Sequence, residues 1–428
     1  MTLLFFWVFL AAMALGVPIV FALGFAPVVG FLATDKLIFM NMIVQRSFAG
    51  INQFPLLAIP FFILAGEVMN QGGITIRLVN FANAVVGHLR GGLAHVNVVT
   101  SMLFAGLSGS AVADTSAIGS LLIPAMEKAG YSRKFAAAIT AASSVIGPII
   151  PPSIIMVIYA FMMNVSVAGL FAAGLVPGLI VGFSLMAATA VISKKRNYPK
   201  AERRATLREF GVATRGAILP LLTPVIILGG ILGGVFTPTE AASVAAGYAL
   251  FLSLFVLKTI KFNDLGGIFL RAATSSSAIL LVVGTATAFA WIATLSQVPV
   301  QMTDLIFSIS DNPLLLLFLI NVLLLVVGMF LDAGPAILIL GPILAPTMVQ
   351  LGIEPLHFAI IMCVNLTVGL ATPPMGLILF VASSVSRLGV EVIAREMLPL
   401  LAIEIAVIFL ITYVPAISLT LPRLLGFL

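Results

Sequence analysis

Two proline pairs interrupt apolar stretches that are long enough to cross a lipid bilayer. Pro151-Pro152 lies in an apolar run over about 135–163, and Pro373-Pro374 lies in another over about 358–382. A proline removes a backbone donor and clashes with the preceding helical turn, so neither run is expected to be one continuous helix. In hydrocarbon the freed carbonyl groups need protein, water or an ion as a partner. Each interruption therefore marks a candidate binding site.

The two interruptions belong to a longer repeated pattern with a constant offset of 222 residues. The residue pairs at this offset include Gly119 and Gly341, Pro124 and Pro346, Gly147 and Gly369, Pro151 and Pro373, and Pro152 and Pro374. A constant register over about forty residues is hard to reach by chance, which indicates an internal duplication. Paired segments interrupted by Gly and Pro in two halves are typical of the binding site of a secondary transporter.

Composition predicts an all-α polytopic membrane protein. The chain has 428 residues, of which 61% are hydrophobic and 8% are charged, and its mean hydropathy is +1.23. Soluble domains carry roughly 25% charged residues. Apolar runs of membrane-spanning length recur without strand-type alternation, which favours helices over a barrel. We expect residues 5–33 to form the first span, bent at Gly16-Val17-Pro18.

A basic segment divides the chain into two halves. Eight of the 21 Lys and Arg residues fall between Lys194 and Arg215. Between membrane helices, such a cluster indicates a cytoplasmic loop at the lipid surface rather than nucleic-acid binding. We predict a first repeat over 1–193, a basic cytoplasmic loop over 194–216, and a second repeat over 217–428. An odd number of crossings in each half would give the two repeats inverted topology.

A re-entrant helical hairpin is expected in each half, at about 96–126 and about 314–348, ahead of broken helices at about 135–163 and 357–385. Each hairpin stretch has apolar ends and a small or polar centre, which can avoid lipid if the tip meets the protein interior. Asp114 and Asp332 lie in these centres. An acidic residue in apolar surroundings is a candidate functional residue, or else a helix cap held by backbone amides.

The interrupted helices supply the oxygen ligands that a hard cation prefers, and at most one carboxylate each favours a monovalent ion. The predicted Na⁺ ligands are Ser108, Ser110, Gly147 and Pro152 in the first half, and Asp332, Gly334, Gly369, Thr372 and Pro374 in the second. No transition metal and no cofactor other than Na⁺ as coupling ion are expected. Helix starts at the same breaks present free N–H groups to an anionic substrate.

A protease is the alternative of a different class. Gly106-Leu107-Ser108-Gly109 matches the G-x-S-G pattern of rhomboid intramembrane proteases, and His95 is the nearest histidine in the sequence. That hypothesis leaves the duplication unexplained. The chain carries no P-loop, HExxH or GxSxG pattern, so the sequence favours an ion gradient as the energy source.

Four motifs together resemble the large membrane subunit of TRAP (tripartite ATP-independent periplasmic, DctM-like) transporters. They begin at Ser108 (SGSAVADT), Ile146 (IGPIIPPS), Phe236 (FTPTEAA) and Ala371 (ATPP). The resemblance covers essentially the whole chain. It implies a Na⁺-driven importer of organic acids such as sialic acid or C4-dicarboxylates, in the bacterial inner membrane, working as an elevator.

The resemblance also implies two partners, a small four-helix membrane subunit on a separate chain and a periplasmic substrate-binding protein. Substrate contacts are expected from Ser110, Asp114, Ser153 and Met375. A stand-alone Na⁺/carboxylate symporter that needs no binding protein is the alternative within transport. The sequence leaves the identity of the acid and the number of Na⁺ ions open.

Overall fold

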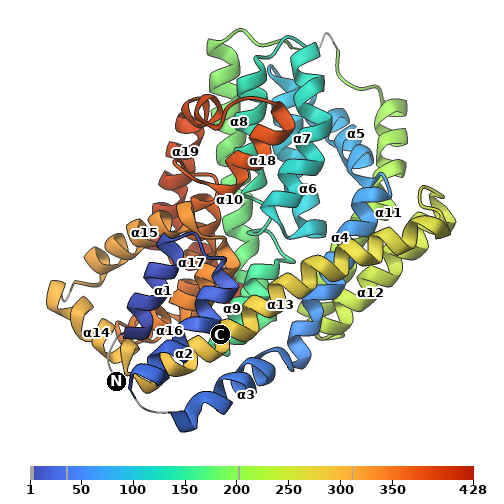
Figure 1. Cartoon of the computed structure of the whole chain (residues 1–428). Helices are drawn as coiled ribbons and strands as arrows, with labels where there is room; N and C mark the ends of the chain where they lie inside the picture. Colours follow the sequence, from blue (N-terminus) through green and yellow to red (C-terminus); the bar gives the residue numbers. More distant parts are fainter. Residues whose placement is uncertain (1–3, 35–36, 201–202, 311) are drawn as a thin grey trace.

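The computed structural model describes residues 4–34, 37–200, 203–310 and 312–428, and within them the all-α prediction is confirmed (Figure 1). These residues form twenty α-helices with short 3₁₀ and π segments, and their only β pairing is an isolated bridge between Arg90 and Lys200. Among the described residues, eight helical stretches are long and apolar enough to cross a membrane. They are Phe54–Gln71, Val167–Lys195, Leu207–Leu232, Pro238–Val256, Phe262–Leu295, Pro313–Phe330, Ala333–Gln350 and Val390–Tyr413.

The first predicted span is wrong in one respect, because the chain folds back instead of bending. Helix α1 (Leu4–Ala14) packs against α2 (Ile19–Ala33). Gly16 has φ +78°, a left-handed conformation that ends a helix, and Pro18 sits just before α2 with its φ already suited to a helix start. The pair therefore forms a helical hairpin.

The N-terminal helices continue as a layer around one long helix. Helices α3 (Met40–Ile51), α4 (Ala58–Gln71) and α5 (Ile74–Val86) follow α2. The 31-residue α13 (Leu265–Leu295) runs diagonally across the molecule and packs on α2, α3 and α4 (Figure 1). Helix α12 (Pro238–Phe251) packs on α4, and α11 (Leu207–Leu232) packs on α5. Helix α14 (Val298–Ile309) ends this group.

In the first half, two antiparallel helices precede an interrupted one. Hairpin 1 consists of α6 (Gly92–Ser108) and α7 (Ala111–Lys128), joined by Gly109-Ser110. Helix α8 (Arg133–Ser144) then ends, and α9 (Ile154–Met163) begins only after the proline pair. We call residues 145–153 break 1. Helix α10 (Val167–Lys195) leads to the basic segment.

The second half follows the same order. Hairpin 2 consists of α15 (Pro313–Phe330) and α16 (Ala333–Gln350), joined by Leu331-Asp332. Helix α17 (Pro355–Gly369) ends before the second proline pair, and α18 (Leu377–Ser386) begins after it. We call residues 370–376 break 2. The peptide bond within each proline pair is cis. Helices α19 (Val390–Tyr413) and α20 (Ala416–Leu424) complete the chain.

The two halves exchange contacts reciprocally. Each hairpin packs against the first part of its own interrupted helix, so that α7 lies on α8 and α15 lies on α17. Each hairpin also packs against the second part of the other interrupted helix, so that α7 lies on α18 and α16 lies on α9. Both tips and both breaks are thereby drawn toward the middle of the molecule. Inverted topology and re-entrance into a membrane stay predictions.

Buried hydrogen bonds fix hairpin 1 to α8. Asn97 Nδ2 donates to Thr140 Oγ1 at 2.6 Å, and Ser101 Oγ donates to Ser143 Oγ at 3.0 Å. The Ser143 hydroxyl also donates to Asn97 Oδ1 at 2.9 Å. All four side chains are fully buried. Because these groups satisfy one another away from water, α6 and α8 are held in one register.

A comparable set fixes hairpin 2 to α17 and α19. Asn365 Nδ2 donates to Asn321 Oδ1 at 2.6 Å, and Thr412 Oγ1 donates to the same oxygen at 3.0 Å. Each hairpin is thus joined to the first part of its interrupted helix by buried polar groups as well as by apolar packing.

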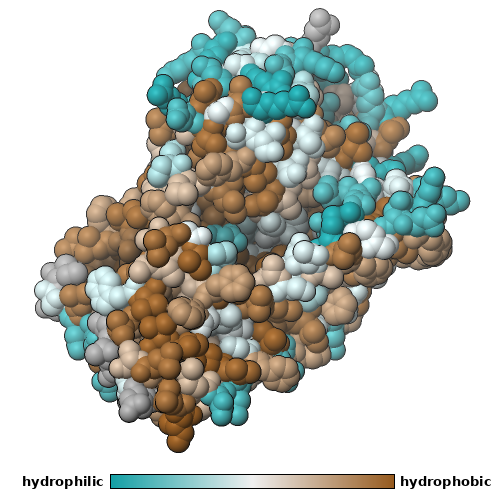
Figure 2. Space-filling view, in the orientation of Figure 1, coloured by the Kyte–Doolittle hydropathy of each residue, from teal (hydrophilic) through white to brown (hydrophobic). Residues whose placement is uncertain are grey.

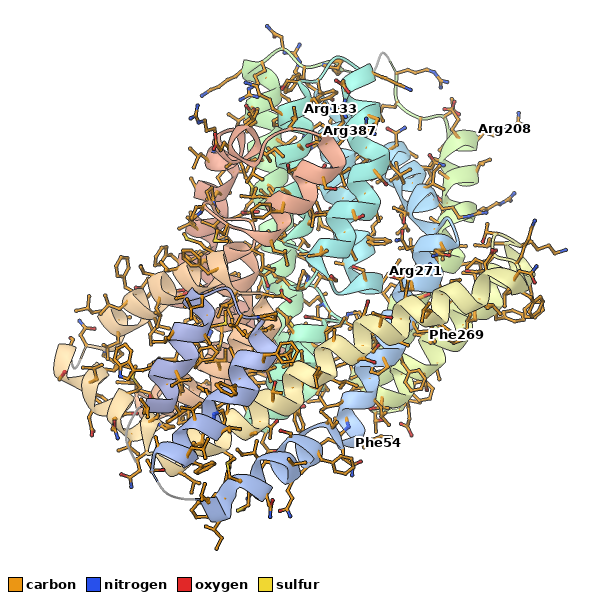
Figure 3. All side chains as sticks on the ribbon, viewed as in Figure 1. Phe54, Arg133, Arg208, Phe269, Arg271 and Arg387 are labelled. Carbon is orange, nitrogen blue, oxygen red and sulfur yellow. The ribbon has the colours of Figure 1, made fainter. Side chains whose placement is uncertain are left out.

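Hydrophilic side chains gather at one end of the molecule, above apolar flanks (Figure 2). The labelled arginines Arg133, Arg208 and Arg387 lie toward this end (Figure 3). Within the described residues, Arg196 and Lys134 both pair with the largely buried Glu396, which ties the end of α10 to α8 and α19.

Candidate functional site

A cavity of about 260 Å³ lies where the two hairpin tips meet. Its walls come from the tip of hairpin 1 (109–112), the tip of hairpin 2 (332–335), Pro148 and Leu370 of the two breaks, and parts of α9, α13 and α16. Residues that are more than two hundred positions apart in the sequence therefore share one hollow. Its polar groups are concentrated at the two tips, and Ile154, Ile155, Ile158, Ile279, Val282 and Leu338 supply most of the apolar wall.

Three helices begin at this cavity. Ala111 at the start of α7, Ile154 at the start of α9 and Ala333 at the start of α16 all line it. The first N–H groups of a helix have no partner within the helix and carry the positive end of its dipole. Side-chain oxygens of Ser110 and Ser153 cap one donor each, at Ala113 N and Met156 N. The remaining donors suit an anionic group such as a carboxylate.

The Asp114 carboxylate lies beside break 1 and not in the cavity. It is fully buried, and its Oδ1 accepts a hydrogen bond from the Ser108 hydroxyl. Its Oδ2 has no hydrogen-bond partner among the described residues. A Cβ added at Gly147 would lie 2.5 Å from this oxygen, so the carboxylate rests directly on the glycine backbone. A buried, unpartnered carboxylate oxygen is unfavourable, and a bound cation is one of the partners that would satisfy it.

Break 1 also carries main-chain oxygens without hydrogen-bond partners among the described residues. Between Gly147 and Pro152, no carbonyl oxygen accepts a hydrogen bond from the described residues. A Cβ at Gly109 would lie 2.8 Å from Pro152 O, which places that carbonyl against the tip of hairpin 1. The predicted first-half ligands Ser108, Gly147 and Pro152 therefore lie near Asp114 or near the tip. This set of oxygen donors fits a monovalent hard cation.

The second predicted Na⁺ set is more dispersed. Asp332 and Gly334 line the cavity, and Asp332 Oδ1 accepts from Ala333 N at 2.8 Å as a helix cap. Thr372 is buried in break 2, where its hydroxyl donates to Val368 O at 2.9 Å. Gly369 meets Gly328 of α15 so closely that a Cβ on it would lie 2.6 Å from Gly328 Cα. This contact gives Gly369 a packing role as well.

Three of the four expected substrate contacts lie away from the cavity lining. Ser153 is fully buried and caps α9 through Met156 N. Met375 is 53% exposed, and neither it nor the neighbouring Pro374 lines the central cavity. Of the four expected substrate residues, Ser110 alone reaches the cavity, because Asp114 turns inward toward Ser108 and Gly147.

Sequence reasoning missed the contribution of α4 and α13. A second hollow of about 150 Å³ adjoins the tip of hairpin 1 and is lined by Ser108 and Ser110 together with Glu67, Asn70 and Ser275. Glu67 Oε2 pairs with Arg271 Nε at 3.3 Å. Arg271 and Phe269 lie on opposite sides of α13 (Figure 3). The hydroxyl run at 275–277 in an apolar helix is the signal that could have pointed to this wall.

The geometry also excludes the protease hypothesis, in which His95 would activate Ser108 as a nucleophile. The Ser108 hydroxyl donates to Asp114, and His95 lies thirteen residues earlier on the same helix. At 1.5 Å of rise per residue, that separation is about 20 Å. A general base must lie within hydrogen-bond reach of its nucleophile, so these residues form no proteolytic pair.

Comparison with known proteins agrees with these observations. Residues 6–417 match the family described as the tripartite ATP-independent periplasmic transporter, DctM component. The chain is 43% identical to the sialic acid TRAP transporter large permease protein SiaM of Vibrio cholerae, over 96% of this chain and 95% of that protein. It is 39% identical to the C4-dicarboxylate TRAP transporter large permease protein DctM of Rhodobacter capsulatus, over 99% of each.

A solved structure shares the fold at low sequence identity. The YdaH transporter of Alcanivorax borkumensis superposes with a TM-score of 0.64 and 16% identity, over 93% of this chain and 90% of that one. The family match spans nearly the whole sequence, and eight helical stretches in the described part of the chain are suited to crossing a membrane. The chain therefore belongs to the TRAP transporter large membrane subunits, and it is a multi-pass inner-membrane transport protein and not an enzyme.

Proposed function

We propose that this chain is the transmembrane pathway of a Na⁺-coupled importer of an organic acid. The observation that carries the proposal is the convergence of three helix N-termini on one cavity beside a buried, unpartnered carboxylate oxygen. The helix starts favour an anion, and the carboxylate favours a cation. Binding the two together would couple their movement.

Asp114 is the proposed centre of the first Na⁺ site, with Ser108 and the main-chain oxygens of Gly147 and Pro152 nearby. This assignment moves Asp114 from the expected substrate contacts to the ion site, because its carboxylate faces break 1. For the second Na⁺ site we retain Asp332, Gly334, Gly369, Thr372 and Pro374 as the proposed set. The dispersal of these residues is consistent with ligands that come together only when substrate is bound.

The substrate is proposed to be a small carboxylate held between the tips. Ser110 offers a hydroxyl, and the starts of α7, α9 and α16 offer backbone donors. Relatives are named for sialic acid and for C4-dicarboxylates. The shared chemistry of those names is a carboxylate, which is the group that these donors suit.

Transport is proposed to proceed by movement of hairpins and interrupted helices together against α4, α13 and their neighbours. The buried hydrogen bonds between α6 and α8, and between α15 and α17, support a unit that moves as one body. The wall that α13 contributes to the cavity is apolar, with Ala278, Ile279 and Val282. An apolar wall without directional bonds to the tips allows sliding.

Two partners complete the proposal, a small membrane subunit and a periplasmic substrate-binding protein that delivers the acid. The test is uptake into proteoliposomes that contain this chain with the small subunit from the same genome. Labelled sialic acid and succinate serve as probes, with the binding protein outside and Na⁺ or K⁺ as the external cation.

We expect uptake of an acid only when Na⁺ and both partners are present. Uptake that persists without the binding protein would favour the stand-alone symporter. Equal uptake in K⁺ would contradict Na⁺ coupling, and a failure to carry any organic acid with all components present would contradict the substrate class.

A further inference from the structure

A further hollow, which we call the basic hollow, lies at the basic end of the molecule and shares no lining residue with the central cavity. Its volume is about 690 Å³, and it is bounded by the end of α10, the start of α6 and the segment that leaves α10. Its charged lining consists of Arg90, Lys194, Lys200, Arg203 and Arg204, and no described acidic side chain lines it. Such a concentration of cations around one hollow creates a strong local positive potential.

Backbone contacts hold this basic hollow together. Gly91 N donates to Pro199 O at 2.9 Å, and Arg90 and Lys200 form the isolated β bridge. Pro199 and Lys200 are thereby fixed to the residues just before hairpin 1. The cations on the two sides of the hollow are positioned by main-chain structure and not only by flexible side chains.

Most of these charges lack a counter-ion within the described residues. Arg203 is paired with Glu209, at 2.8 Å and 3.0 Å. Arg90, Lys194, Lys200 and Arg204 make no ion pair with a described carboxylate. Four like charges around one space repel each other, and a bound anion would relieve that repulsion.

The outer face of α10 indicates which kind of anion would fit the basic hollow. Phe183 is 60% exposed and Val191 is 55% exposed, and Ala187 and Ala190 are exposed between them. These positions fall on the helix face that ends at Lys194, because residues three and four apart share a face. The face is apolar along its length and reaches the cationic hollow at its end, which matches a lipid with acyl chains below a charged headgroup.

We propose that this hollow binds the phosphate of an anionic phospholipid headgroup, with the acyl chains lying along α10. By the positive-inside rule, this end of the chain faces the cytoplasmic leaflet, where anionic lipids attract basic segments. The headgroup contacts the start of hairpin 1 together with Lys200, Arg203 and Arg204. The site is separate from the central cavity and does not depend on which acid is transported.

The test compares two double variants that remove the same charge. Arg90→Gln with Lys194→Gln removes cations from the hollow, whereas Lys195→Gln with Arg215→Gln removes exposed cations of the same region that do not line it. Delipidated full-length protein in detergent is titrated with fluorescent phosphatidylglycerol, phosphatidylcholine, or soluble glycerol 3-phosphate as a competitor.

The wild type and the Lys195/Arg215 control are expected to bind phosphatidylglycerol more tightly than phosphatidylcholine. The Arg90/Lys194 variant is expected to lose at least about tenfold in affinity, since it removes two of the cations that attract the lipid phosphate. Lys200→Gln with Arg204→Gln is a second variant, to be used if the first does not fold. It removes two other cations of the hollow, and we expect the same loss of affinity.

Three results would overturn the proposal. An equal loss in the Lys195/Arg215 control would assign the effect to general surface charge. Equal affinity for phosphatidylcholine and phosphatidylglycerol would show that binding does not require an anionic headgroup. Displacement of phosphatidylglycerol by glycerol 3-phosphate at the same concentration would identify a soluble phosphate ligand in place of a lipid.

Discussion

At the scale of single residues, Asp114 is the group on which the proposed Na⁺ coupling depends most directly. Contacts with three neighbouring residues fix its position. Ser108 supplies one hydrogen bond, Gly147 supplies room at its backbone, and Ser110 accepts the N–H of Ala113 one turn earlier. The remaining oxygen has no described partner, which is the property expected of an ion ligand.

Asp114→Asn keeps the shape of this side chain and removes its charge. We expect the apparent affinity for Na⁺ to fall at least about tenfold, which corresponds to the loss of about 1.4 kcal/mol of ion binding. The measurement is the Na⁺ concentration dependence of uptake in proteoliposomes. Ser116→Ala, on the exposed side of the same helix, is the matched control. An unchanged Na⁺ dependence in Asp114→Asn would remove this residue from the ion site.

Ser110→Ala and Asp332→Ala test the two tips of the cavity. Both side chains line the cavity and both cap the helix that follows them. Loss of a cap costs about 1 kcal/mol of helix stability, so both variants should still insert and fold. We expect each to reduce Na⁺-dependent uptake, measured at equal amounts of membrane-inserted protein. Wild-type uptake rates in both variants would contradict the proposal that the two hairpin tips bind Na⁺ and substrate.

At the scale of elements, close backbone contacts determine where each interrupted helix sits. Helices α15 and α17 cross at Gly328 and Gly369, with no room for a side chain at either position. The crossing places break 2 beside hairpin 2. The sequence predicts Gly369 as a cation ligand from its place before the proline pair, and the structure adds a steric reason for glycine there.

Gly369→Ala should therefore destabilise the protein by about 1–3 kcal/mol, because the new methyl group meets backbone atoms that cannot move aside. Gly229→Ala is the comparison, since this exposed helical glycine has open space around it. It should be neutral or slightly stabilising, because Ala favours a helix over Gly by about 1 kcal/mol. Thermal unfolding in detergent measures both. Equal midpoints for the two variants would contradict the steric explanation.

At the scale of the whole molecule, the two halves are interlocked, and the elements around α13 form the surface that they face. The contacts of α7 with α18 and of α16 with α9 make the hairpins and interrupted helices one assembly. Helix α13 contacts that assembly chiefly through the apolar wall of the cavity and through α16. Relative movement between the two bodies is the transport step proposed here.

A reversible cross-link tests that movement. Ala113 of hairpin 1 and Ser275 of α13 line the same small hollow, so cysteines at both positions should react with a short, cleavable bifunctional maleimide. The buried Cys363 is first replaced by Ser. We expect cross-linking to stop uptake and cleavage to restore it, since the linker ties the two bodies together. Each single-cysteine variant treated with the reagent is the control, and full transport in the cross-linked protein would contradict movement of hairpin 1 against α13.

The sequence by itself determined the class of the protein and the places where its helices are interrupted. The apolar composition, the proline pairs and the constant offset between halves depend only on local chemistry, because two adjacent prolines strongly disfavour a continuous helix. Single prolines such as Pro124 in α7 and Pro177 in α10 lie inside continuous helices. The same local signal predicted candidate residues at the tips and breaks. At residues 5–33 it predicted a bend where the chain makes a full reversal, since Gly16 and Pro18 are compatible with either.

Only the tertiary structure decided which of these residues meet. Asp114 faces break 1 because α7 packs on α8, and Ser153 turns inward to cap α9. Helix α13 supplies part of the cavity wall from a segment with no interruption to mark it. Contacts between residues that are hundreds of positions apart arise from helix packing, which a local pattern does not encode.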